Sequence, residues 1–353
     1  MTVRSILRGC ILFTATVLTG TADATTYYVA PGGNDGNTGT SWTAARQTIQ
    51  GGVDVATVAG DVVVVSNGTY NITNEITLST AITLRSANGA ATTIVRRSGG
   101  NTRIFSISAD ATLDGFTVQE GTVGGIFMSA GTVRNCVIAG NSGPNCGGVR
   151  LQVQGSTPVL VEDCIITNNQ NTTGDGGGVV CYSWGGSGSA TIRNNLIAYN
   201  SANHNGGGIA MDKGMIENCT IVSNSAGWWY RGSGVRISGV IASITNSIIY
   251  YGAATFTGPP YDLFGFIDYV GYSCSPDLTN GLKGNITANP LFKDPGSGDY
   301  HLTGSSPCVN TGSNAAWMSA ATDLAGLRRI SSGRVDMGAY ESLGIMGTVF
   351  CIH

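Results

Sequence analysis

A short apolar segment closed by asparagines recurs along the chain and constrains its fold more than any other feature. The segment reads NCVIAGN at 135–141, DCIITNN at 163–169, NNLIAYN at 194–200 and NCTIVSN at 218–224, and it returns less regularly as TNSIIYY at 245–251. The first Asn or Asp of each regular copy lies six residues before its last Asn. Aligned on this first residue, with Asn246 in the last copy, the copies are 28, 31, 24 and 28 residues apart. A constant segment with variable spacing indicates one strand per repeat, joined by loops of different length.

A second segment lies between these copies: GGVRL from 147, GGVVC from 177, GGIAM from 207 and GSGVRI from 232. Period-2 alternation places one set of its residues inward, namely Val149, Val179, Ile209 and Val235, followed two positions on by Leu151, Cys181, Met211 and Ile237. Such repeats predict an all-β parallel β-solenoid, with about nine or ten coils between residues 61 and 270. We expect the asparagines to form a column, because Asn tolerates a left-handed turn and its amide can bond to the Asn one coil away.

Residues 1–24 are typical of a signal peptide, with two arginines ahead of an apolar run at 11–18 and the small residues of ADA at 22–24 as a cleavage site. The protein is therefore expected to be secreted or held at the cell surface. We expect an N-terminal cap at 25–60 with a short helix over the first coil, the β-helix coils at 61–270 and a C-terminal closing module at 271–353. No later stretch approaches the roughly 20 apolar residues of a transmembrane helix.

Removal of residues 1–24 takes away two Arg and one Asp, and leaves 16 basic and 20 acidic side chains. Nucleic acid is excluded as a partner, because binding phosphates needs a basic face. Eight cysteines remain, of which Cys136, Cys164 and Cys219 share an inward position of the repeat and are expected to be buried. Cys274 and Cys308 fall outside the coil register and are the pair expected to form a disulfide.

Two regions outside the repeats carry a family resemblance. The segment from Tyr27 to Tyr70, with YYVAPGGNDGNTGTSW and GDVVVVSNGTY, and the segment from Gly284 to Glu341, with GNITANPLFKDPGSGDYHL and DLAGLRRISSGRVDMGAYE, are similar to secreted bacterial proteins of the pectate-lyase-like superfamily. The resemblance implies a right-handed parallel β-helix closed by a choice-of-anchor-type module. That superfamily contains lyases, hydrolases, epimerases and adhesins, so the resemblance implies a fold more specifically than an activity.

One outward column of the repeat carries charges that alternate in sign, namely Arg134, Glu162, Arg193 and Glu217, before it ends at Thr245. A charged groove for a sugar acid is one interpretation. Cross-strand ion pairs between neighbouring coils explain the alternation better, because self-neutralised charges leave no net field for a polyanion.

A different outward surface is the candidate site. Its strand positions are Arg150, Tyr182, Asp212 and Arg236, with Trp184 and Lys213 beside them, and adjoining loops add His204, Trp228, Trp229, Tyr230 and Arg231. Aromatic rings next to hydrogen-bonding and cationic groups are typical of saccharide sites. The alternatives are a hydrophobic flap folded onto its own solenoid and a protein interface.

Catalysis on this surface has two forms. For β-elimination of a uronate, Lys213 or Tyr182 is the candidate base and Arg150 or Arg236 the candidate carboxylate clamp. Hydrolysis needs two carboxylates and ranks lower, because Asp212 has no acidic neighbour in its column, although Asp175 lies on a turn that can approach it.

Calcium can assist such lyases, and Gly-rich turns hold Asp35, Asp294 and Asp299, but these turns form readily without metal and no metal ligand is assigned. We therefore expect a protein that binds or degrades an extracellular polysaccharide, with β-elimination of a uronate-containing glycan as the leading reaction. The alternative is a non-catalytic structural or adhesive surface protein. The sequence makes no prediction of the oligomeric state.

Overall fold

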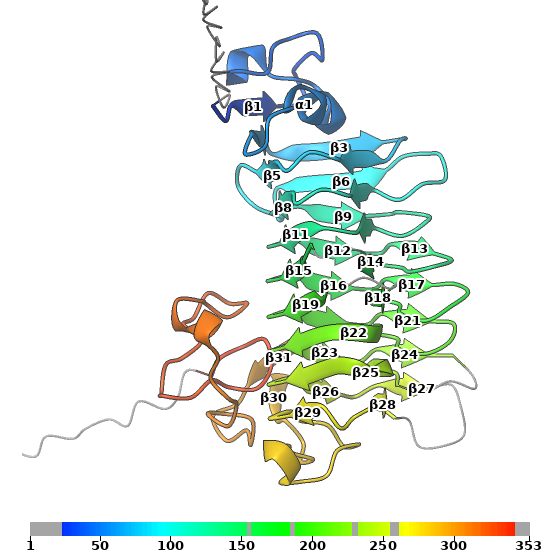
Figure 1. The fold of residues 1–353 in the computed structure, drawn as a ribbon, viewed down its shortest axis with the longest axis vertical. Helices are drawn as coiled ribbons and strands as arrows, with labels where there is room; N and C mark the ends of the chain where they lie inside the picture. Colours follow the sequence, from blue (N-terminus) through cyan, green and yellow to red (C-terminus); the bar gives the residue numbers. More distant parts are fainter. Residues whose placement is uncertain (1–22, 154–156, 184–187, 228–231, 255–260, 343–353) are drawn as a thin grey trace, which may run out of the picture.

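The computed structural model describes residues 23–153, 157–183, 188–227, 232–254 and 261–342. The chain winds into a parallel β-solenoid of about seven turns (Figure 1). This is fewer than the nine or ten coils expected. In that part no helix is long and apolar enough to cross a bilayer.

The first sheet consists of two parallel strips that merge where β22 and β25 run through both. One strip contains β4 (Ile76–Leu78), β7 (Phe105–Ile107), β10 (Ile126–Met128), β14 (Val149–Val153), β18 (Val179–Ser183), β22 (Ile209–Glu217), β25 (Val235–Thr245) and β28 (Leu263–Gly265). The other contains β1 (Thr26–Val29), β2 (Val62–Val65), β5 (Thr83–Ser86), β8 (Thr112–Asp114), β11 (Gly131–Arg134), β15 (Val159–Glu162) and β19 (Ala190–Arg193), then β22, β25 and β29 (Val270–Gly271).

Two further parallel sheets complete each turn. The second sheet contains β3 (Gly68–Ile72), β6 (Thr93–Arg97), β9 (Thr117–Gln119), β12 (Val137–Ala139), β16 (Ile165–Thr167), β20 (Leu196–Ala198), β23 (Thr220–Val222) and β26 (Ile248–Tyr250). The third contains β13 (Ser142–Gly143), β17 (Gln170–Asn171), β21 (Ser201–Ala202), β24 (Ser225–Ala226) and β27 (Ala253–Ala254). The apolar repeat predicted from sequence is therefore the second sheet, and the Gly-rich repeat is one strip of the first.

Side chains that alternate inward fill the solenoid, as predicted. The eight expected inward residues of the Gly-rich repeat are 0–1% exposed, and so are Cys136, Cys164 and Cys219. Asn195 and Ser247 occupy the cysteine position in the other turns and are 0% exposed. Their polar atoms are used, since Asn195 Oδ1 accepts from the Cys164 N–H at 2.8 Å and Ser247 Oγ from the Cys219 N–H at 3.2 Å.

The asparagines form two columns, one at each end of the second sheet. The first Asn or Asp of each copy has positive φ, between 48° and 55°, as a left-handed turn requires; these residues are Asn135, Asp163, Asn194, Asn218 and Asn246. The last Asn of each copy forms a buried amide ladder. Asn141 Nδ2 donates to Asn169 Oδ1 at 3.0 Å, Asn169 Nδ2 to Asn200 Oδ1 at 2.9 Å, and Asn200 Nδ2 to Asn224 Oδ1 at 3.0 Å.

The N-terminal end of the solenoid is covered by α1 (Ile49–Val55), which follows the 3-10 turn η1 (Trp42–Ala44) (Figure 1). Thr48 caps the helix by accepting from the Gly51 N–H at 2.9 Å. A Cβ on Gly52 would lie 2.3 Å from Val29 Cγ2, so the glycines that weaken this helix allow it to pack against β1. The predicted capping helix is thus present.

The C-terminal module contains the antiparallel hairpin of β30 (Phe292–Asp294) and β31 (Asp299–Leu302), with η2 (Leu282–Gly284) before it and η3 (Ala316–Ser319) after it. Phe292, Tyr300 and Leu302 pack against Leu196, Val222 and Ile248 of the second sheet. The module therefore lies along the outer side of the last turns, as Figure 1 shows.

The predicted disulfide between Cys274 and Cys308 is not formed in this structure, where both are free, buried thiols. The prediction placed Cys274 outside the coil register, yet it forms parallel bridges with Ile248 and Ile286 and so continues the register of the second sheet. Its Sγ contacts the carbonyl oxygen of Ala288 at 3.2 Å. Both cysteines instead pack in the apolar contact between solenoid and module.

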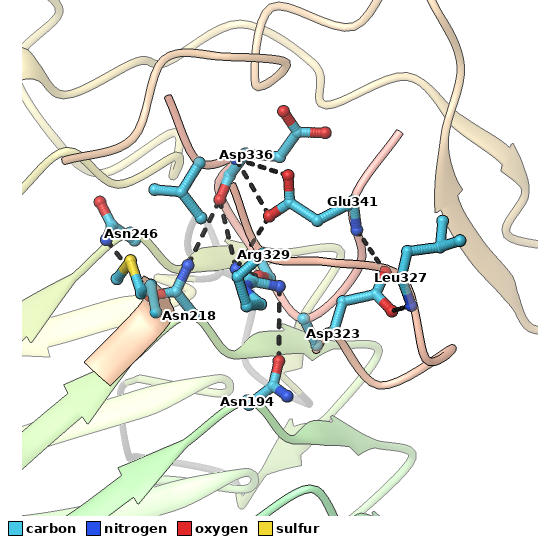
Figure 2. Close-up of polar contacts among 12 residues, drawn as sticks. Asn194, Asn218, Asn246, Asp323, Leu327, Arg329, Asp336 and Glu341 are labelled. Atoms are coloured by element: carbon cyan, nitrogen blue, oxygen red, sulfur yellow. Dashed lines mark hydrogen bonds and ion pairs between the residues drawn. The ribbon is translucent and has the colours of Figure 1, made fainter. Parts of the chain in front are cut away.

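A buried arginine joins the module to Asn194, in the solenoid's column of residues with positive φ (Figure 2). Arg329 is 0% exposed; its Nη2 lies 3.3 Å from Glu341 Oε1 and donates to Gly338 O at 2.9 Å, while Nη1 donates to Asn194 Oδ1 at 3.4 Å. Asp323 Oδ1 accepts from the Leu327 N–H at 2.7 Å. The charged residues of DLAGLRRISSGRVDMGAYE therefore hold the module together and dock it.

The alternating outward column forms ion pairs, one of them between two of its predicted members. Arg193 Nη2 lies 2.7 Å from Glu162 Oε2, and Arg134 Nη2 lies 2.9 Å from Asp114 Oδ2 one turn earlier. The Arg193 guanidinium also lies 4.8 Å from the ring centre of Trp317 in the module. This column is consequently structural.

Candidate functional site

The candidate strand residues lie along one strip of the first sheet, over four consecutive turns. Arg150 in β14 is in register with Val180 in β18, Val180 with Ala210 in β22, and Ala210 with Arg236 in β25. Three strand spacings separate the two arginines, which is about 14 Å. Arg150 and Arg236 therefore cannot clamp the same carboxylate.

Asp175 brings Tyr182 and Arg236 together. Its Oδ2 accepts from the Tyr182 hydroxyl at 3.0 Å and lies 2.9 Å from Arg236 Nη1, while Oδ1 accepts from the backbone N–H and Nδ2 of Asn205, each at 2.9 Å. Asp175 lies in the turn before β18, and its carboxylate joins Tyr182 of β18 to Arg236 of β25, two strands further along the strip. Its ion pair with Arg236 is internal and leaves that arginine less available to an anionic ligand.

The residue roles expected for β-elimination find little support in this geometry. Burial, with the nearby Asp175 carboxylate, raises the pKa of Tyr182 well above its ordinary value, which disfavours it as a base. Asp212 Oδ1 accepts from the Ser183 N–H at 2.8 Å. Lys213 is half-buried at a register shift between β22 and β25. Strand β22 continues through this residue, and no turn begins there.

The centre of this strip is covered by its own turns. Val180 is 1% exposed and Ala210 0% exposed, although both alternate outward, and they pack with Cys146 and Tyr182. A Cβ on Gly176, whose φ is +74°, would lie 2.1 Å from Val180 Cγ2, so the turn at 174–178 passes directly over the strand. This face is partly closed to a ligand.

Five of the predicted site residues lie outside the described residues: Trp184, Trp228, Trp229, Tyr230 and Arg231. His204 is half-buried in the turn after β21, where its N–H donates to Gly174 O at 3.0 Å and its carbonyl accepts from the Gly227 N–H at 2.9 Å. His204 therefore stands beside the third sheet, between the covered strip and the groove described next.

A polar groove of about 370 Å³ runs across the third sheet. We call this the polar groove; it is lined by Gln170, Asn171, Thr172, Ser201, Ala202, Asn203, Ser225, Ala226 and Gly227. Its outward residues form two columns over three turns, Gln170, Ser201 and Ser225 in one and Thr172, Asn203 and Gly227 in the other. Amide and hydroxyl groups thus repeat at the strand spacing, about 4.8 Å.

The polar side chains of this groove are available to a ligand. Those of Gln170, Thr172, Ser201, Asn203 and Ser225 make no hydrogen bond within the part of the chain that the structure describes. Sequence reasoning missed these residues because it searched the aromatic loops. The signal was present, since the first four strands of the third sheet each begin directly after the last Asn of a repeat.

A larger groove of about 580 Å³ beside α1 has several of its polar groups engaged. Gln50 Oε1 accepts from the Thr77 N–H at 2.9 Å, Thr48 Oγ1 donates to Asp35 Oδ2 at 2.7 Å, and Asn71 Oδ1 accepts from Arg96 Nε at 2.8 Å. These bonds fasten the N-terminal cap to the first turns. The polar groove is therefore the better candidate for ligand binding.

The acidic turns considered for calcium serve local structure. Asp35 Oδ1 accepts from the Gln47 and Thr48 N–H groups, each at 2.9 Å, and Asp299 Oδ1 pairs with His301 Nδ1 at 2.6 Å. Among the described residues no three His, Cys, Asp or Glu side chains come together as a metal site.

Two of the solved structures that are similar to this chain are a pectate lyase and a rhamnogalacturonan lyase. Pectate lyase Pel9A is 14% identical, with 91% of this chain and 97% of that chain covered and a TM-score of 0.48. The rhamnogalacturonan lyase is 14% identical, with 76% of this chain and 91% of that chain covered and a TM-score of 0.34. No curated protein sequence matches significantly. The family described as right handed beta helix region matches residues 38–240, more than half of the 353 residues. The chain therefore belongs to the right handed beta helix family.

Proposed function

We propose that the chain binds an extracellular polysaccharide in the polar groove. The observation that carries this proposal is the two columns of amide and hydroxyl side chains that have no partner in the described part of the chain. They stand in contrast to the charged column of the first sheet, where neighbouring turns pair with one another.

The repetition of the groove suits a polymer. A polysaccharide presents hydroxyl groups at regular intervals, and the groove presents donors and acceptors at each strand spacing of about 4.8 Å. Several weak polar contacts, repeated along one chain, add up to useful affinity where a single sugar would bind weakly. The leader-like segment at 1–24 favours export, and hence an extracellular glycan.

β-Elimination of a uronate-containing glycan is the second candidate function, and Arg150 is the residue that favours it. Its half-buried guanidinium makes no hydrogen bond or ion pair with a described residue and can neutralise a uronate carboxylate. Lys213 is the remaining candidate base, since Tyr182 is bound to Asp175. A screen of uronate polysaccharides for absorbance of the unsaturated product tests this reaction, and loss of the signal in Arg150→Ala would support it.

The binding proposal is tested by filling the groove. Ser201→Trp places a large side chain at the centre of the groove on an outward position, where the fold tolerates it. Thr191→Trp is the matched control, because Thr191 is an outward residue of β19 in the same turn but on the first sheet. Both should melt like the wild type.

We expect Ser201→Trp to abolish retardation of the protein in polysaccharide-containing native gels and Thr191→Trp to keep it. Retardation that survives Ser201→Trp would remove the polar groove as the binding site. Failure of every polysaccharide to retard the wild type would favour the structural or adhesive alternative.

A further inference from the structure

The polar groove has no ionisable side chain among its nine lining residues. Its available donors and acceptors are the amides of Gln170 and Asn203 and the hydroxyls of Thr172, Ser201 and Ser225. A neutral amide bonds to a sugar hydroxyl without the cost of removing a charge from water. Recognition in this groove is therefore by hydrogen bonds between uncharged groups.

Among the described residues, a charged pair near the groove is neutralised internally. Asp175, in the turn that leads from the third sheet to β18, is held 2.9 Å from Arg236 Nη1. The chain as a whole has a formal net charge of −3. A polyuronate carries a carboxylate on each sugar, and these would lose hydration at the groove without a cation in return.

We infer that the glycan bound by the polar groove is a neutral polysaccharide. This inference rests on the proposed function and deepens it by naming the chemical class of the ligand. It departs from the uronate-containing glycan expected from the sequence, because that expectation was built on the arginines of the first sheet and not on the third.

Two tyrosines in the turns that lead into the third sheet fit the same class of ligand. Tyr199 and Tyr251 stand in the turns two residues before β21 and β27, and both have a φ of 57°, a rare conformation for an aromatic residue. Tyr199 is 43% exposed and Tyr251 37% exposed. Sugar rings pack their C–H faces on such exposed aromatic faces.

The C-terminal module holds these rings in place. The Tyr300 hydroxyl donates to that of Tyr199 at 2.7 Å, and the Tyr251 hydroxyl donates to Asn289 Oδ1 at 3.0 Å. Because their hydroxyls are engaged on the module side, the rings lose little freedom when a sugar binds, which favours affinity. The module thus fixes the position of two exposed aromatic rings next to the third sheet.

The test compares three soluble probes by isothermal titration calorimetry: galactomannan and mixed-linkage glucan as neutral polysaccharides, and polygalacturonate as the anionic one. We expect at least one neutral probe to bind, with an affinity that changes by less than about twofold between about 20 mM and about 500 mM salt. Ser201→Trp should lower that affinity at least about tenfold and Thr191→Trp should leave it unchanged. Polygalacturonate should bind at least about tenfold more weakly than the neutral probe.

Variants of Tyr199 separate stacking from module docking. Tyr199→Ala should lower the affinity about 3- to 10-fold, and Tyr199→Phe should restore most of it, because the ring remains while the bond to Tyr300 is lost. Equal losses in the two variants would refute the stacking role.

Different results would refute the neutral ligand class and the binding site itself. Tighter, salt-sensitive binding of polygalacturonate that Ser201→Trp abolishes would overturn the neutral class and leave the groove as the binding site. Binding of no probe, or binding that is indifferent to Ser201→Trp, would overturn the proposed function and this inference with it.

Discussion

Replacement of Asn169 by alanine tests how much the buried amide ladder stabilises the solenoid. Asn169 is 1% exposed, and its Nδ2 donates to Ile138 O at 2.8 Å and to Asn200 Oδ1 at 2.9 Å. Its Oδ1 accepts from the N–H and the Nδ2 of Asn141, each at 3.0 Å. Alanine removes these partners from two buried backbone groups, the Asn141 N–H and the Ile138 carbonyl.

The expected loss follows from those two groups. A buried polar group without its partner costs about 1–3 kcal/mol, so Asn169→Ala should lower the free energy of unfolding by about 2–6 kcal/mol. Urea unfolding followed by circular dichroism measures this as a lower midpoint at unchanged slope. Gln170→Ala is the control, because the adjacent Gln170 is exposed and should change stability by less than about 0.5 kcal/mol.

Asn169→Asp separates the acceptor role of the Asn169 amide from its donor role. Aspartate keeps the acceptor for Asn141 but brings a buried carboxylate against Ile138 O and Asn200 Oδ1. Its pKa in the folded protein should therefore lie above its unfolded value of about 3.9, so the variant should lose stability relative to wild type as the pH rises through that folded pKa. A loss below about 1 kcal/mol in Asn169→Ala, or equal stability of Asn169→Asp at pH values on either side of that range, would refute the reasoning.

The remaining predictions concern the module. Arg329→Met removes the donor to two buried acceptors, Gly338 O and Asn194 Oδ1, and we expect a loss of about 2–6 kcal/mol, measured by urea unfolding. Burial raises the pKa of Glu341 to about 8, so the stability it contributes is complete below its unfolded pKa and is lost as the pH rises through about 8. Glu341→Gln should flatten that dependence in melting curves, and an unchanged slope would contradict the assignment. Cys274 and Cys308 should be recovered as free thiols when the native protein is unfolded in alkylating agent and mapped.

The candidate site was predictable only in part. Alternation placed Arg150, Tyr182 and Arg236 correctly on one outward strip, and a turn position allowed Asp175 to approach. No pattern in the chain indicated that Asp175 would reach Arg236 two strand spacings away, because the course of a loop is not periodic. The polar groove was missed since its side chains are ordinary surface residues until three turns stack them into two columns.

The structural features that recur in each turn could be predicted from the sequence. In a solenoid each residue meets the same position of the next turn, so the fixed interval of six residues was enough to predict the inward cysteines, the asparagine ladder and the ion-paired column. The features that occur only once in the chain depend on tertiary contacts. Cys274 joined the register of the second sheet, and the module docked along the side of the solenoid through Arg329. Those contacts depend on one copy of each partner and on apolar packing between segments far apart in the chain, which leaves no period in the sequence to read.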